Sequence, residues 1–97
     1  MRKMYVYILS NTRRTVYYVG VTNFLQRRLS EHRNRLHKNS FTDRYNCVQL
    51  IYYEKYDSPM EAIRREKELK KWRREKKLLL VKRVNPGLKS VRCPVLR

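Results

Sequence analysis

Two apolar runs near the start of the chain place the strongest constraint on its fold. Residues 4–9 and 16–21 are rich in β-branched and aromatic residues, which favour strands. The polar stretch 10–15 between them is typical of a turn, so we predict an antiparallel hairpin. Both faces of both strands are largely apolar, and each face of the resulting sheet must therefore be covered by other elements.

A third strand is predicted over residues 47–54, which are again apolar and aromatic, after a polar loop over residues 37–46. Helical patterns follow the second and third strands. The predicted order is β-β-α-β-α-α, an α+β fold with a three-stranded antiparallel β-sheet flanked by helices. A chain of 97 residues forms one domain. We place this domain at residues 1–87 and a basic tail at 88–97.

The first helix follows Thr22 or Asn23, either of which is a suitable N-cap. Asn23 with Gln26 resembles a capping box. The apolar stripe of this helix consists of Leu25, Leu29 and Leu36, and His32 lies on the same stripe.

The second helix begins at Ser58, which serves as its cap, followed by Pro59 at the first helical position and Glu61 completing a capping box. A further helix or a continuation covers 75–84, and residues 85–87 stop it.

The charge of the chain indicates a polyanionic partner. There are 25 Lys and Arg against 8 Asp and Glu, a formal net charge of +17. Nucleic acid is the leading partner for so basic a small domain, ahead of acidic membrane surfaces and acidic proteins. No apolar run approaches the roughly 20 residues of a membrane span, and the start lacks a signal-peptide pattern. We expect a cytoplasmic protein.

The cysteines contribute little to this picture. Cys47 and Cys93 are far apart and form no CxxC pair, and we expect reduced thiols. Together with His32 and His37 they match no common zinc spacing, so no zinc site is predicted.

Glu66 is the most informative acidic residue. It is spaced three and four residues from Ile63, Leu69 and Lys70, so it lies on or beside the apolar stripe of its helix. A carboxylate there is costly unless it is paired or bound to a cation. Two interpretations stay open: an ion pair with Lys70 four residues on, or a metal ligand.

Basic residues between positions 64 and 83 lack balancing acids, which favours a face that follows a phosphate backbone. The candidate nucleic-acid contacts are Arg27, Lys67, Lys70, Lys71, Arg73 and Arg74. Trp72 within this run is either a core anchor or a surface on which bases stack.

Tyr7 and Tyr18 lie on the paired strands, and Arg28 lies one helical turn before His32. Taken singly, the tyrosines fit ordinary sheet packing and the Arg28–His32 pair fits a solvated surface or a phosphate grip.

Their order along the chain is more specific. Residues 5–7 (Tyr-Val-Tyr), followed about ten residues later by 18–20 (Tyr-Val-Gly), resemble the two tripeptides that define the GIY-YIG nuclease domain. Arg28, His32 and Glu66 match this family's helical arginine, histidine and glutamate. The stretch 66–72, with Asn85 and Pro86 later, is similar to small stand-alone bacterial members. The resemblance covers roughly residues 3–87.

This resemblance implies an endonuclease that hydrolyses phosphodiester bonds in DNA, structured or damaged DNA included, with one Mg²⁺ or Mn²⁺ ion. Glu66 would hold the metal, weakly in the absence of nucleic acid. Tyr7 or Tyr18 would position or deprotonate the attacking water, and Arg28 would stabilise charge on the phosphate. His32 would orient a tyrosine or share a proton with it. No small-molecule cofactor is implied.

Three positions depart from the family pattern or match it weakly. Tyr5 replaces the first glycine, Val21 stands where a lysine is often found, and Asn85 matches a late asparagine only by its approximate place. A non-catalytic basic module that binds DNA or RNA therefore stays open as the alternative, with an RNA- or ribosome-associated protein behind it. Either enzyme or module would recognise charge and shape rather than bases.

Overall fold

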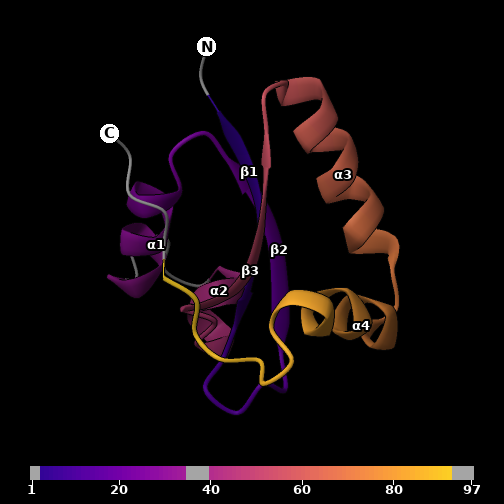
Figure 1. Cartoon of the computed structure of the whole chain (residues 1–97). Coiled ribbons are helices and arrows are strands. Elements are labelled where there is room, and N and C mark those ends of the chain that lie inside the picture. Colours follow the sequence, from indigo (N-terminus) through magenta and orange to yellow (C-terminus); the bar gives the residue numbers. More distant parts are fainter. Residues whose placement is uncertain (1–2, 35–39, 93–97) are drawn as a thin grey trace.

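A computed structural model describes residues 3–34 and 40–92 of the chain. Its elements are β1 (Met4–Ser10), β2 (Tyr17–Thr22), α1 (Leu25–Arg33), α2 (Phe41–Tyr45), β3 (Gln49–Tyr56), α3 (Pro59–Lys71) and α4 (Arg74–Val84) (Figure 1). The predicted α+β class and the predicted order of the main elements are confirmed, with α2 as an addition. No helix in the described ranges is long and apolar enough to cross a membrane.

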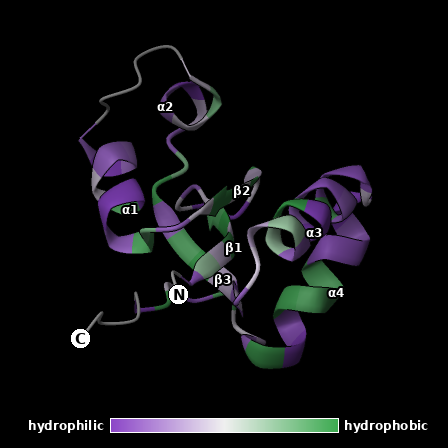
Figure 2. Cartoon of the chain, turned by 90° about the horizontal axis from the view of Figure 1, so that it is seen from above, coloured by the Kyte–Doolittle hydropathy of each residue, from purple (hydrophilic) through white to green (hydrophobic). Residues whose placement is uncertain are grey.

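The sheet has the order β2-β1-β3, and both pairings are antiparallel. Its central strand, β1, is buried from Tyr5 through Ser10. As Figure 2 shows, α1 lies on one side of the sheet and α3 with α4 on the other. Separate apolar clusters fill the two sides, one including Leu25 and Leu29 and the other including Ala62 and Leu69. The prediction that both faces are covered is therefore correct.

The helix that follows the hairpin begins later than predicted. Its N-cap is Phe24, with no side-chain cap, so the predicted caps at Thr22 or Asn23 and the predicted capping box with Gln26 are wrong. Thr22 is still part of β2, and its hydroxyl accepts a hydrogen bond from the Phe24 N–H at 3.1 Å. The hydroxyl thus shapes the turn into α1 rather than capping the helix.

The segment predicted as a loop contains α2. Ser40 caps it by accepting from the Asp43 N–H, and Asn46 ends it in the left-handed conformation at φ 58°. The Cys47 N–H then bonds to the Thr42 carbonyl at 2.9 Å. Because Cys47 closes this helix, β3 begins only at Gln49 and runs through Tyr56 instead of spanning 47–54. Residues 37–39 of the predicted loop lie outside the described residues.

The start of α3 follows its prediction: Ser58 accepts from the Glu61 N–H, and Pro59 is the first helical residue. Helix α3 ends with Trp72 as its C-cap in extended backbone conformation. Helix α4 follows as a separate helix that ends before Asn85.

Asn85 has a clear structural task beyond ending α4. Its Nδ2 donates to the Ile51 carbonyl at 2.9 Å and to the Lys89 carbonyl at 2.8 Å, and its Oδ1 accepts from the Lys89 N–H at 3.1 Å. The Val91 N–H bonds to the Leu50 carbonyl at 2.7 Å. Asn85 therefore fastens the following segment along the outer edge of β3, where the strand has a register shift opposite Ile8 and Leu9.

Glu54 of β3 joins the sheet to α3. Its carboxylate accepts from Arg65 Nε at 2.9 Å and Nη2 at 3.0 Å, from the Tyr56 hydroxyl at 2.7 Å, and from the Tyr52 hydroxyl. Burial alone would raise the pKa of Glu54, but the hydrogen bonds from Arg65, Tyr52 and Tyr56 outweigh it and hold the pKa below its usual value. The guanidinium of Arg65 also lies 5.1 Å from the centroid of Trp72.

We expect Glu54→Gln to lower the free energy of unfolding at pH 7 by about 2 kcal/mol, because Arg65 and two hydroxyls lose their charged acceptor. A depressed pKa contributes stability that is present above the unfolded value of about 4.3 and lost as the pH falls toward the folded value. Urea denaturation should therefore show the two proteins converging below about pH 4. Glu61→Gln, at an exposed position, should change stability by only a few tenths of a kcal/mol; an equal loss there would contradict the prediction.

Candidate active site

Tyr7 and Gly20 face each other across the β1–β2 ladder. Tyr7 is 1% exposed, and its ring lies directly over Gly20. A Cβ added to Gly20 would stand 2.4 Å from both Cζ and Oη of Tyr7, far inside contact distance. The bare Cα of Gly20 is therefore what lets the phenol cross β2.

His32 receives this phenol on the α1 side of the sheet. The His32 Nε2 lies 3.4 Å from the Tyr7 hydroxyl, and its Nδ1 lies 2.8 Å from the Thr42 hydroxyl of α2. The imidazole is 5% exposed, so these two contacts fix its orientation. The Tyr18 ring lies edge-on to His32, with 5.7 Å between centroids, and is tilted by 45° to the Tyr7 ring, with 6.3 Å between centroids.

Arg28 adds a cation one helical turn before His32, where it pairs with Glu31 at 3.1 Å. Burial raises the pKa of Tyr7 to about 12, although a side-chain hydrogen bond with Arg28 acts in the opposite direction. At pH 7 Tyr7 is therefore a neutral phenol that donates and accepts hydrogen bonds. The structure brings the four predicted residues Tyr7, Tyr18, Arg28 and His32 together.

Glu66 lies on α3 and is linked to this group through Lys70. Its side chain is 13% exposed and forms an ion pair with Lys70, with Oε2 and Nζ 2.7 Å apart. The ion-pair interpretation from spacing is therefore confirmed. Lys70 also lies 6.0 Å from the centroid of Tyr18, so it contacts both the carboxylate and the aromatic group.

The donor set here suits a hard cation that keeps much of its water. Within residues 3–34 and 40–92, no three His, Cys, Asp or Glu side chains gather into a metal-binding group. Magnesium is commonly held by one or two carboxylates, with waters and substrate phosphates as its other ligands. Glu66 offers one such carboxylate, which is paired with the Lys70 ammonium in this structure. His37 and Cys93, weighed for zinc, lie outside the described residues.

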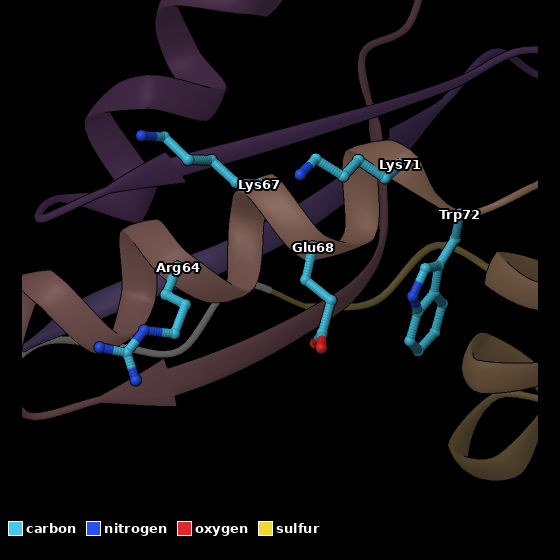
Figure 3. A pocket seen from close by; sticks show the side chains of 5 residues that line it. All are labelled: Arg64, Lys67, Glu68, Lys71 and Trp72. Carbon is cyan, nitrogen blue, oxygen red and sulfur yellow. The ribbon is translucent and has the colours of Figure 1, made fainter.

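The six predicted nucleic-acid contacts do not form one surface. Arg27 lies on α1, across the sheet from α3, and its guanidinium packs 5.3 Å from the centroid of Phe24. Lys67 and Lys71 border a shallow hollow on the outer side of α3, together with Arg64, Glu68 and Trp72 (Figure 3).

Arg73 and Arg74 lie at the junction between α3 and α4. Arg74 donates to the Thr15 carbonyl at 2.6 Å, and its guanidinium lies 5.7 Å from the centroid of Tyr17.

Trp72 packs partly buried against the core, with Lys76 4.2 Å from its centroid, which agrees with the core-anchor interpretation.

The sequence interpretation missed Thr42, which holds His32, and Phe41, which stacks on Tyr18 with 6.0 Å between centroids. Both lie in the segment predicted as a loop. The spacing of Ser40 and Asp43 is a capping signal that could have indicated α2.

Gly20→Ala tests how closely the site depends on the Tyr7–Gly20 contact. The added methyl must displace the Tyr7 ring, so we expect the free energy of unfolding to fall by about 1–3 kcal/mol. The nuclear Overhauser contacts between Tyr7 and His32 should also be lost. Gly87→Ala is the matched control, because its Cβ would meet only the flexible Lys89 side chain, at 3.4 Å. Intact Tyr7–His32 contacts in Gly20→Ala would refute the packing argument.

The chain is similar in sequence to a known protein family. Residues 3–78 match the family described as the GIY-YIG catalytic domain, a range that ends before Asn85. A UPF0213 protein of Syntrophus aciditrophicus is 37% identical over 86 residues, covering 89% of this chain and 97% of the relative. One from Staphylococcus saprophyticus is 35% identical over 81 residues, covering 84% and 96%.

A solved structure is similar as well. The solution NMR structure of a UPF0213 protein from Bacillus halodurans aligns with a TM-score of 0.57 and 29% identity, over 88% of each chain. The family match spans most of the chain and includes both tripeptides and Glu66. The chain belongs to the GIY-YIG catalytic domain family.

Proposed function

We propose that this protein is a metal-dependent endonuclease that hydrolyses phosphodiester bonds in DNA, in preference to RNA, with structured or damaged DNA among its substrates. The observation that supports it most is the cluster of Tyr7, Tyr18 and His32. Arg28 hydrogen-bonds to Tyr7, and Lys70, the ion-pair partner of Glu66, lies beside Tyr18. Net charge of +17 supplies the attraction to a phosphate backbone.

The chemistry divides among these residues by their charge and burial. As a neutral phenol Tyr7 positions the attacking water by hydrogen bonding, and the imidazole at 3.4 Å is the neighbouring group that takes up or returns its proton. Arg28 stabilises the negative charge that develops on the phosphate oxygens. Glu66 would hold the divalent ion, which supplies a more acidic water and neutralises phosphate charge.

Glu66→Gln is the direct test. We expect it to lower cleavage at least about 100-fold in a panel of single-stranded, duplex and branched DNA and RNA with Mg²⁺ or Mn²⁺, while metal-free DNA binding changes less than about twofold. Glu68→Gln, two residues away on the exposed side of α3, is the control that changes the same charge. Cleavage by Glu66→Gln at the wild-type rate would refute the assignment.

One observation favours the alternative of a non-catalytic nucleic-acid-binding module: the carboxylate of Glu66 is occupied by Lys70. That alternative predicts that the logarithm of the binding constant falls with the logarithm of the salt concentration, with a slope of about 0.9 per phosphate contacted. It also predicts no cleavage of any substrate in the panel.

If Lys70 competes with the metal, removing it should help the metal to bind. A partly exposed ion pair is worth up to about 1 kcal/mol, so Lys70→Met should lower the Mg²⁺ concentration for half-maximal cleavage by up to about fivefold. Lys67→Met, one helical turn earlier, removes the same charge from the outer hollow and should leave that concentration unchanged. Equal effects of the two substitutions would show that only overall charge matters.

A further inference from the structure

Two exposed aromatic side chains, Phe41 and Tyr45, extend the aromatic cluster of the candidate active site from Tyr18 to the protein surface. Phe41 is 44% exposed and Tyr45 is 47% exposed, both on α2. Phe41 stacks on Tyr18 at 6.0 Å with a 30° interplanar angle, and Tyr45 follows Phe41 at 4.8 Å. We call Tyr18, Phe41 and Tyr45 the aromatic step. It leads from the buried rings of the candidate active site to the surface.

The aromatic step is held in a fixed place relative to the site. Thr42, the residue after Phe41, bonds to His32 at 2.8 Å, and its carbonyl accepts from the Cys47 N–H at 2.9 Å. Ser40 caps the helix at its other end. The same short helix therefore orients the imidazole inward and presents two rings outward.

The surroundings of the aromatic step are basic. Phe41 borders a hollow whose other sides are Val16, Tyr17, Arg74 and Lys77. Arg44 is exposed on α2 itself. Aromatic planes flanked by cations are the usual surface for single-stranded nucleic acid, because bases stack on the rings and phosphates meet the charges.

We propose that the aromatic step stacks an unpaired nucleobase next to the phosphate being cut, so that the substrate class is DNA with unpaired nucleotides beside the scissile bond. This inference rests on the proposed function. In continuous duplex each base face is covered by its neighbours, and a side chain reaches a face only after the base is unstacked. An aromatic pair beside Tyr18 therefore favours flaps, bulges and single-stranded ends over uninterrupted duplex.

The experiment uses metal-free full-length protein, so that binding is measured without cleavage. Probes are a single-stranded DNA with 2-aminopurine at successive positions and a blunt duplex of the same length. With the wild-type protein we expect quenching of 2-aminopurine fluorescence at one or two positions. Phe41→Ala should weaken single-strand binding about tenfold and change duplex binding less than twofold. Phe41→Tyr should retain quenching, whereas Phe41→Leu, which keeps apolar volume without a ring face, should lose it.

Phe24→Ala is the matched control, since Phe24 is also exposed, at 37%, and also lies beside a cation, Arg27. The inference is overturned if Phe24→Ala weakens binding as much as Phe41→Ala, or if no position is quenched. It is also overturned if single-stranded RNA is bound and quenched more strongly than DNA, or if Phe41→Ala dissolves a dimer, which would make the aromatic step a self-contact.

Cleavage of nicked, flapped and continuous duplex with Mg²⁺ separates this inference from the proposed function. Quenching without cleavage of any substrate would refute the nuclease and leave the stacking site. Cleavage of continuous duplex at the same rate as flapped DNA, unchanged in Phe41→Leu, would refute the stacking site and leave the nuclease.

Discussion

The packing of the Tyr7 ring over the backbone of Gly20 governs how this site is assembled. The Tyr7 side chain, on the central strand β1, passes over the backbone of the neighbouring strand β2 at Gly20, where a Cβ would stand 2.4 Å from the ring. This crossing brings the phenol to His32, and His32 in turn is held by α2. The contact between β1 and β2 thus places the Tyr7 hydroxyl beside His32 of α1, which α2 holds through Thr42.

Several of the few acids of this very basic chain hold cations in fixed places. Glu54 ties β3 to α3 through Arg65, Asp57 pairs with Lys3, and Glu31 holds Arg28 beside the tyrosines. Each of these carboxylates gives at least one cation a fixed place, and Glu31 also lies 3.9 Å from Arg27. Because cations so outnumber acids, an excess of positive charge is left for a polyanion, and a charge of +17 is compatible both with a defined fold and with binding.

Much of this molecule could be predicted from its sequence. Strand residues with apolar character on both faces required a covered sheet, and the Ser58–Pro59 start of α3 follows from local capping chemistry. The ordered set from Tyr7 to Glu66 indicated the family. The caps of α1 were mispredicted because Thr22 uses its hydroxyl in a turn while still in β2. The place of Thr42 depends on a contact with His32 that no local pattern encodes.

Asn85 also affects how much of the outer edge of the sheet is open to another chain. An edge strand with free backbone groups is a template for pairing with another chain, and β3 is such an edge in a sheet of only three strands. The Asn85 amide and the segment reaching Val91 occupy carbonyls of Ile51 and Leu50 on that edge. The segment beyond α4 therefore covers part of that edge, and these two carbonyls are not open to pairing with the edge of another chain.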